Sequence, residues 1–274
     1  METLAYGYGL VEAPRVDDGG SLYFSDAIGG GVYRRSPDGE ITIVVPKRRG
    51  VGGLVLHADG GVVVSGKNVV HVRDGETRVL LEVEGALGFN DLTTDREGRV
   101  FVGSLRSSAF ESGPRVPGEL WRIDGERRAT EVYRGIEFAN GVGFSPDYRT
   151  VYHSNYSEAY VLAHDLDDSG AGVNRRVFAR MPKGNPDGLA VDESGAVWVA
   201  LGSGGGLARF SARGELLSVV EVPSPFVTSL CFGAPDRRDL YVTTLENGED
   251  PARKGTIFRT RSDVPGLVTA LARV

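Results

Sequence analysis

The sequence has a single cysteine, Cys231, among 274 residues. An intrachain disulfide and a cysteine-based metal cluster are therefore excluded, and the apolar stretch around Cys231 predicts that it fills the core. No apolar run reaches the length of a membrane-spanning helix. The first residues also lack the charged start and apolar centre of a secretion signal, so we expect a cytoplasmic protein with no membrane partner.

Long basic runs are also absent, and the formal net charge is −6, which argues against nucleic acid as a partner. No Gly-Lys-Ser/Thr follows the glycine runs 29–31 and 202–206, and no Gly-x-Ser-x-Gly occurs, so a phosphate loop and an α/β-hydrolase elbow are unsupported. The four histidines show no metal-ligand spacing; His153 is the one candidate for a catalytic role. We expect a small-molecule substrate and a monomer or weak homo-oligomer.

Helical spacing of apolar residues is never sustained, because glycine or proline interrupts each candidate helix. Glycine itself is abundant, at 39 residues, and short apolar strands are joined by Asp-Gly and Arg-Gly turns. The content of 41% hydrophobic residues is sufficient for a substantial core. The sequence predicts an all-β protein with one domain, residues 1–274.

A unit of strand, Asp/Gly turn and strand recurs along the chain. Its turn aspartates lie at intervals of about 36 to about 52 residues, a spacing typical of four-stranded propeller blades. We therefore predict a six-bladed β-propeller with four antiparallel strands per blade. Pairing of residues 3–8 with residues 256–261 would close the ring. The turn aspartates are Asp17, Asp59, Asp95, Asp147, Asp192 and Asp236.

The residue that heads each unit is the candidate for function. If each unit begins with the innermost strand of a blade, these head residues form a ring around one mouth of the channel. Carboxylates and amides gathered there would suit a hard divalent cation. Alternatively, these polar residues only bond loose backbone groups at strand starts, and the pattern leaves both interpretations open. The head residues are Glu12, Gly52, Asn90, Asn140, Asp187 and Thr228.

Three connections are longer than a hairpin turn: residues 106–118, 202–206 and 246–255. Each follows the second strand of its unit, so we expect them on the face that bears the head residues, as lids or binding walls or as plain surface excursions. Arg106, at the start of the first of these loops, and Tyr156, after the fourth unit's second strand, are candidates for substrate contact.

Five segments, in collinear order, resemble the senescence marker protein/gluconolactonase family, which includes regucalcin and related lactonases. They are VEAPRVDDGGSLYFSD, FNDLTTDREGRVFVGSL, FANGVGFSPD, NPDGLAVDESGAVWVA and SLCFGAPDRRDLYVTT. The resemblance implies a six-bladed propeller with one divalent cation at the top of its channel, with Ca²⁺ favoured and Mg²⁺, Mn²⁺ or Zn²⁺ as alternatives. It implies Glu12, Asn140 and Asp187 as metal ligands and Asn90 as a substrate-binding residue.

The sequence departs from the sugar-lactone pattern of that family at four positions. Val16 stands where tryptophan is usual, Gly88 where arginine is usual, Leu92 where glycine is usual and Asn155 where aspartate is usual. Loss of the arginine removes a fixed guanidinium that could hold sugar hydroxyls. A less polar lactone or ester is therefore as compatible with the sequence as a sugar lactone.

The resulting hypothesis is a metal-dependent lactonase or esterase. The ion would polarise the substrate carbonyl, Asp187 or the ion would activate water, and Asn90 would donate a hydrogen bond to the oxyanion. One alternative is a non-hydrolytic enzyme on the same propeller that acts on a hydrophobic metabolite. Another is a metal-binding propeller without catalysis, although the Trp-Asp dipeptides of common interaction propellers are absent.

Overall fold

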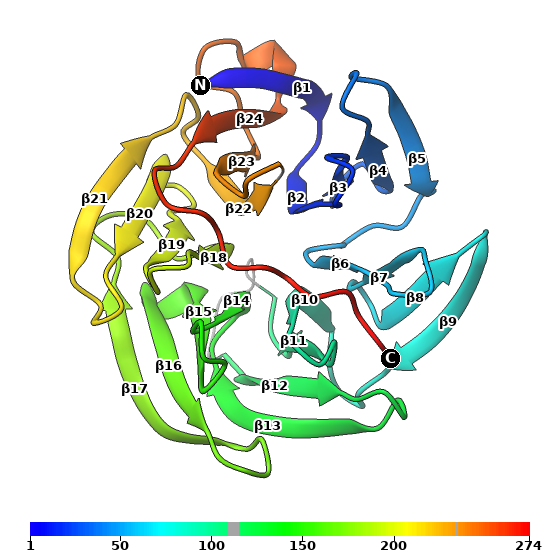
Figure 1. Cartoon of the computed structure of the whole chain (residues 1–274), viewed down its shortest axis with the longest axis vertical. Helices are drawn as coiled ribbons and strands as arrows, with labels where there is room; N and C mark the ends of the chain where they lie inside the picture. Colours follow the sequence, from blue (N-terminus) through cyan, green and yellow to red (C-terminus); the bar gives the residue numbers. More distant parts are fainter. Residues whose placement is uncertain (109–114, 234) are drawn as a thin grey trace.

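The computed structural model describes residues 1–108, 115–233 and 235–274. Six antiparallel sheets of four strands each surround a central channel, so the predicted six-bladed propeller is confirmed (Figure 1). The described residues contain no α-helix, only the 3-10 turns η1 (Tyr156–Glu158) and η2 (Pro251–Arg253). None of their helices is long and apolar enough to cross a membrane.

In the first five blades, the strands follow chain order outward from the channel. The first blade has β2 (Val11–Val16), β3 (Leu22–Asp26), β4 (Val32–Arg35) and β5 (Ile41–Val45), and the second has β6 (Leu54–Leu56), β7 (Val62–Val64), β8 (Val69–Arg73) and β9 (Glu76–Leu81). The third has β10 (Gly88–Thr94), β11 (Val100–Leu105), β12 (Gly118–Ile123) and β13 (Ala129–Ile136). The fourth has β14 (Ala139–Phe144), β15 (Thr150–Asn155), β16 (Tyr160–Leu166) and β17 (Gly172–Arg180), and the fifth has β18 (Leu189–Val191), β19 (Val197–Ala200), β20 (Gly206–Phe210) and β21 (Leu216–Glu221).

The sixth blade joins the two ends of the chain. It contains β22 (Val227–Gly233), β23 (Asp239–Thr244) and β24 (Gly255–Arg261), and its outer strand is the N-terminal β1 (Glu2–Tyr8). β1 pairs with β24 in antiparallel register, from Glu2 opposite Arg259 to Tyr8 opposite Gly255. The predicted ring closure is therefore confirmed. Of the predicted long connection 106–118, residues 109–114 lie outside the described residues.

The apolar core consists of six clusters, one between each pair of neighbouring blades. Cys231 belongs to the cluster between the sixth and first blades, together with Phe24 and Ile257, and is only 6% exposed. Its predicted place in the core is confirmed. Since full burial of a large apolar side chain contributes about 1.5 to 3 kcal/mol, these interfaces rather than the single sheets supply most of the stability.

Five of the six recurring aspartates hold the turn between the first and second strands with a side-chain hydrogen bond; in the second blade, Asp59 N donates to His57 Nδ1 at 3.0 Å instead. Asp95 Oδ1 accepts hydrogen bonds from the backbone N–H groups of Glu97 and Arg99 at 3.1 and 3.0 Å. Asp192 Oδ1 does the same for Ser194 and Ala196, both at 3.0 Å. This is ordinary aspartate turn chemistry, which explains why the residue repeats with the blades.

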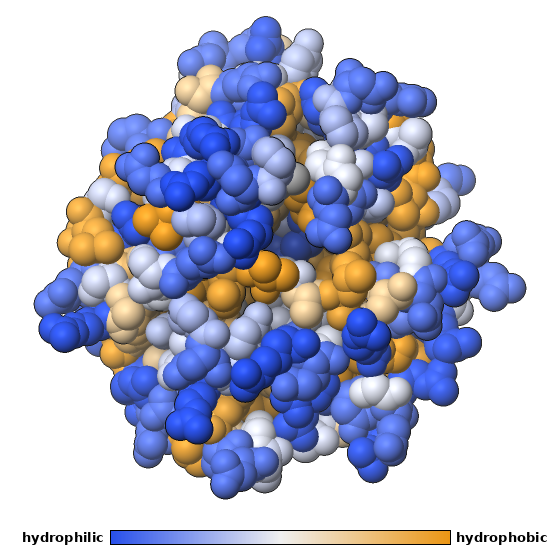
Figure 2. Space-filling view, viewed as in Figure 1, coloured by the Kyte–Doolittle hydropathy of each residue, from blue (hydrophilic) through white to orange (hydrophobic). Residues whose placement is uncertain are grey.

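The chain after β24 crosses one mouth of the channel, the one facing the viewer in Figure 1. Backbone N–H groups of this C-terminal segment, residues 262–274, bond the ends of inner strands: Leu267 to Val191 and Ala272 to Leu56, both at 2.8 Å. Figure 2 shows apolar atoms near the centre of this face. A cavity of about 330 Å³ lies there, bordered by Phe144 among others. The head residues lie at the opposite ends of the inner strands.

Candidate functional site

The head residues lie where the innermost strands begin, and contacts join them around the ring. Four hydrogen bonds link consecutive blades: Thr228 Oγ1 to Val11 O at 2.5 Å, Gly188 N to Thr228 O at 2.8 Å, Gly141 N to Asp187 O at 3.2 Å, and Asn90 Nδ2 to Ala139 O at 3.0 Å. Gly52 and Asn90 also touch, because a Cβ on Gly52 would lie 1.9 Å from Asn90 Oδ1. The structure thus brings all six head residues to one rim; their roles there stay predictions.

Bulges shape this rim. The pairing of first and second strands shifts register at the head residue in four blades, between residues 12 and 15, 89 and 92, 139 and 142, and 227 and 229. Ala13, next to Glu12, has a positive φ of 53°. Because a bulge redirects side chains that strict alternation would send to the sheet face, these irregularities reorient the chain at Glu12, Asn90, Asn140 and Thr228, whereas the strands after Gly52 and Asp187 pair without a shift.

Two head residues are buried acids. Glu12 is 9% exposed and Asp187 4%. Burial raises the pKa of Glu12 well above its usual value, and the negative charges of Asp187 and Asp91 raise it further. Burial likewise raises the pKa of Asp187, against a hydrogen bond from Asn140 that lowers it. The protein thus holds two carboxyl groups in a place that disfavours their charges unless a positive charge joins them.

The polar atoms around Asp187 fit a cation. Asp187 Oδ1 is buried and has no hydrogen-bond partner among the described residues, which is costly for a carboxylate oxygen. A hard cation bound by Glu12, Asn140 and Asp187 would give that oxygen a partner and neutralise both acids. Within the described residues, no group of three or more His, Cys, Asp or Glu side chains is arranged for a metal. An ion at the rim would therefore need the amide oxygen of Asn140 as well as the two carboxylates.

Two further charged residues lie below the rim, and sequence reasoning did not single them out. Asp91 is 2% exposed, and burial raises its pKa to about 6 despite the opposing charge of Arg15. Arg15 Nη2 lies 3.7 Å from Asp91 Oδ1 and donates to Leu92 O at 2.8 Å. The Asn-Asp pair at residues 90 and 91 was the available signal, but strict strand alternation would turn Asp91 away from the channel.

The remaining head residues divide into two kinds. Thr228 Oγ1 donates to Val11 O at 2.5 Å and shares a hydrogen bond with Thr243 Oγ1 at 3.0 Å, so it joins blades as the structural alternative supposes. Asn90 is half-buried, and its Nδ2 uses one hydrogen on Ala139 O. Among the described residues, this is the one hydrogen bond found for Nδ2. Gly52 has no side chain because Asn90 fills the space.

Tyr156 lies close to the two acids. Its ring is half-buried and packs against Phe138 with centroids 5.7 Å apart. Burial raises the pKa of Tyr156 to about 12, and the charges of Asp187 and Glu12 add to this. The phenol is therefore a neutral hydrogen-bonding group beside the buried acids, a position compatible with its predicted contact to substrate.

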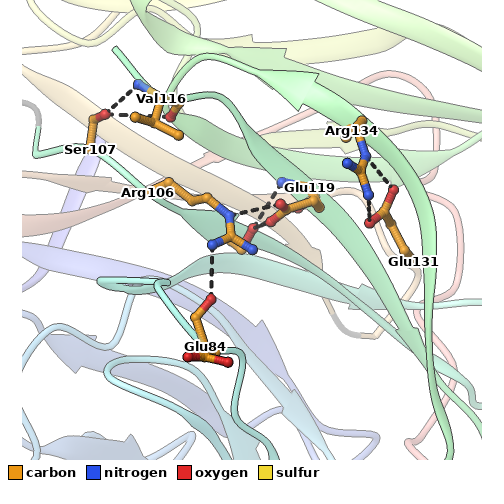
Figure 3. Close-up of polar contacts among 8 residues, drawn as sticks. Glu84, Arg106, Ser107, Val116, Glu119, Glu131 and Arg134 are labelled. Atoms are coloured by element: carbon orange, nitrogen blue, oxygen red, sulfur yellow. Dashed lines mark hydrogen bonds and ion pairs between the residues drawn. The ribbon is translucent and has the colours of Figure 1, made fainter. Parts of the chain in front are cut away.

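Arg106 is engaged in a structural ion pair (Figure 3). Its Nε lies 2.7 Å from Glu119 Oε1, and its Nη1 donates to Glu84 O at 2.9 Å. Glu119 is 6% exposed and also bonds the hydroxyl of Ser104. The positive charge of Arg106 is therefore balanced inside the protein, which weakens its case as a cation for substrate.

Gly88, where the resemblance leads one to expect arginine, has no room for any side chain. A Cβ there would lie 2.8 Å from the backbone oxygen of Gly66. Phe89 N donates to that same oxygen at 2.7 Å, so the second and third blades approach closely at this point. The guanidinium is excluded by backbone packing, and glycine is a structural requirement here.

His153 lies in the interior of the protein, packed between blades. It is fully buried, and its Nδ1 shares a hydrogen bond of 3.0 Å with the hydroxyl of Tyr133. Its Nε2 faces Gly103, where a Cβ would lie 3.0 Å away. The ring thus lies between the third and fourth blades, and these contacts do not favour a catalytic role.

Comparison with known proteins gives consistent matches. A family model described as SMP-30/Gluconolactonase/LRE-like region matches residues 10–246. A 6-deoxy-6-sulfogluconolactonase from Pseudomonas putida is 32% identical over 91% of this chain and 90% of its own. The pentonolactonase XacC from Haloferax volcanii is 31% identical over 91% of this chain and 86% of its own. A solved luciferin-regenerating enzyme has a TM-score of 0.89 and 25% identity, covering 100% of this chain and 99% of the other.

Proposed function

Because this chain belongs to the SMP-30/gluconolactonase/LRE-like family, we propose that it is a hydrolase that opens lactones with the help of one divalent cation. The observation that carries the proposal is the buried pair Glu12 and Asp187, together with the unpartnered oxygen of Asp187. Relatives named 6-deoxy-6-sulfogluconolactonase and pentonolactonase support a sugar-derived lactone as the substrate class.

The proposed ligands of the cation are Glu12, Asn140 and Asp187. Their oxygen donors and double negative charge favour Ca²⁺, with Mg²⁺, Mn²⁺ or Zn²⁺ as alternatives. A bound ion supplies a Lewis acid for the lactone carbonyl and for a water molecule. The raised pKa values of both acids mean that ion binding releases protons, so affinity for the ion should rise with pH.

The side chains of the rim can perform the remaining steps. Asp187 takes the proton of the attacking water, through a carboxylate that also helps to hold the ion. Asn90 turns its free N–H group toward the oxyanion that forms at the carbonyl. Tyr156 presents its hydroxyl and ring edge to the lactone, while the burial of Glu12 and Asp187 keeps bulk water from competing.

The test is elemental analysis of protein purified without added metal, combined with hydrolysis of a panel of sugar lactones, aliphatic lactones and esters with and without chelator. We expect about one divalent ion per chain, hydrolysis of at least one lactone, loss of turnover with chelator and recovery with Ca²⁺. Stoichiometric metal without hydrolysis would favour a non-hydrolytic enzyme on the same propeller. Absence of metal from active protein would contradict the proposed role of the ion.

A further inference from the structure

Arg48, in the connection from β5 to β6, is a half-buried cation without an acidic partner. Its Nε donates to Ser65 O at 3.0 Å, and its Nη2 donates to Asn68 O at 2.6 Å and Asn68 Oδ1 at 2.9 Å. All three acceptors are neutral, and among the described residues no carboxylate lies within ion-pair distance. Glu82 bonds Asn68 at 2.7 Å but does not reach Arg48. Burial lowers the pKa of Arg48, so its charge is partly desolvated.

Arg48 is connected to the rim through one residue. Ser65 is fully buried, and its hydroxyl accepts hydrogen bonds from Gly52 N at 3.2 Å and Gly53 N at 2.9 Å. Gly52 in turn touches Asn90. The residue that fixes the guanidinium of Arg48 therefore also fixes the backbone beside the predicted substrate-binding asparagine.

Closely packed glycine backbone lies between Arg48 and the rim. A Cβ on Gly66 would lie 3.4 Å from Arg48 Nη2, and a Cβ on Gly88 would lie 2.8 Å from Gly66 O. Gly66 and Gly88 are buried, so these contacts pack Arg48 against the backbone that leads to Asn90. Because Gly88 lies two residues before Asn90, Arg48 lies close to the predicted substrate-binding asparagine.

Arg106 and Arg48 differ in whether an acid neutralises the guanidinium charge. Both guanidinium groups are held by hydrogen bonds to backbone oxygens, but Arg106 is neutralised by the buried Glu119 (Figure 3). Arg48 Nη1 has no partner among the described residues, and its charge has no counterpart. A guanidinium that is already oriented and lacks a counter-ion is suited to bind an anion, because charge-assisted hydrogen bonds are about twice as strong as neutral ones.

We propose that Arg48 binds an anionic substituent, a carboxylate, sulfonate or phosphate, on the lactone that the rim hydrolyses. This inference rests on the proposed function and narrows its substrate class to acidic lactones. The anion supplies the negative charge that Arg48 lacks. Arg48 would thus provide a cation that glycine at position 88 cannot provide. Arg106 remains a structural link between blades.

The test uses two sugar γ-lactones that differ only at the terminal carbon: gluconic γ-lactone, with a hydroxymethyl group, and glucaric γ-lactone, with a carboxylate. With Ca²⁺ present, Arg48→Met should raise KM for the acidic lactone by about tenfold or more and leave kcat/KM for the neutral lactone within about twofold. The matched control is Lys67→Met, which removes an exposed charge beside Gly66. It should change either substrate by less than about threefold.

Other outcomes separate this inference from the proposed function. Equal losses on both lactones, no loss on either, or a wild-type preference for the neutral lactone would overturn the role of Arg48 and leave the lactonase assignment standing. If wild-type protein hydrolyses neither lactone, calorimetry with glucarate decides. Binding that Arg48→Met weakens by about tenfold supports the anion site, and absence of binding to wild-type protein overturns it.

Discussion

The two mouths of the channel use aspartate in opposite ways. At the mouth crossed by the C-terminal segment, Asp192 is fully buried and both of its oxygens are engaged: Oδ1 by two backbone N–H groups at 3.0 Å, and Oδ2 by Trp198 Nε1 at 3.0 Å and Arg209 Nη2 at 2.9 Å. At the rim, Asp187 is nearly as buried but its Oδ1 has no partner. The two aspartates are thus similarly buried, but only Asp192 has hydrogen-bond partners for both oxygens among the described residues, which agrees with the proposed role of the rim.

The hydrogen bonding of the backbone also differs between the two mouths. Four of the six inner strands are bulged where they meet the rim, whereas at the other mouth β6 and β18 gain extra hydrogen bonds from the C-terminal segment. The far mouth is thus stabilised by additional backbone contacts, and the rim holds a buried carboxylate oxygen without a partner among the described residues. A buried polar group without a partner lowers the free energy of unfolding unless a ligand binds it. Proteins commonly accept such a loss of stability at an active site.

The largest expected effect is on turnover, from Asp187→Asn. Loss of the proposed proton acceptor and of one metal-ligand charge should slow turnover by roughly 10³-fold or more. Without metal, the free energy of unfolding should stay the same or rise, because a buried carboxylate is replaced by a neutral amide. Lactone hydrolysis and urea unfolding in chelator measure the two effects. A variant with wild-type turnover would remove Asp187 from the mechanism.

Asp192→Ala is the corresponding substitution at the other mouth, where we expect an effect on stability and none on turnover. It leaves Arg209 without its acid and two backbone N–H groups without acceptors, so the free energy of unfolding should fall by roughly 3 kcal/mol. The folded protein should turn over substrate at the wild-type rate. Urea unfolding and initial rates at low temperature measure these effects. If stability were unchanged while turnover slowed, the division between structural and functional mouths would be wrong.

The sequence predicted the fold well because its signals are local. A turn aspartate bonds backbone groups two and four residues away, as Asp95 does, so the turn and its flanking strands can be recognised from a short window. The head residues Glu12 and Asp187 could be aligned because they occupy the same place in each repeat. Because the repeats place these residues at equivalent positions, their meeting in one ring could be predicted from the sequence.

What the sequence could not predict depends on contacts between distant segments. Asp91 faces the channel only because the bulge between residues 89 and 92 interrupts alternation. The glycine requirement at Gly88 comes from the oxygen of Gly66 in another blade. The neutralisation of Arg106 by Glu119 and the unpaired state of Arg48 likewise appear only when the blades are assembled.

Two buried histidines lie between the third and fourth blades, away from both mouths. They predict that the stability of the protein falls in acid. Burial lowers the pKa of His153 to about 3 and that of His164 to about 4. Both values lie below the usual value of about 6.5, so the folded state binds fewer protons than the unfolded state. Their stabilising effect is complete above about pH 6.5 and is lost as pH falls toward 4, at up to about 1.4 kcal/mol per pH unit for each histidine.

Urea unfolding at pH 7 and pH 5, with and without His153→Gln, measures this effect. The variant should lose less stability between the two pH values than the wild type, because one of the two buried histidines no longer takes up a proton. The difference in pH dependence between the two proteins should be the same with and without metal, since His153 contacts Tyr133 and not the rim. Identical pH dependence in both proteins would exclude His153 as a source of acid sensitivity.

The smallest effect concerns Asn90, which separates binding from chemistry at the rim. Asn90→Ala removes the free N–H group and one bond to Ala139 O, and we expect KM to rise by about tenfold with a smaller change in kcat. Gly52→Ala is the companion variant, because its Cβ would displace the side chain of Asn90 without removing it. It should therefore reproduce the KM effect in part, and steady-state kinetics on one lactone measure both. If Asn90→Ala instead slowed turnover by roughly 10³-fold, Asn90 would belong beside Asp187 in the chemical step, because losses of that size arise from groups that act in the transition state.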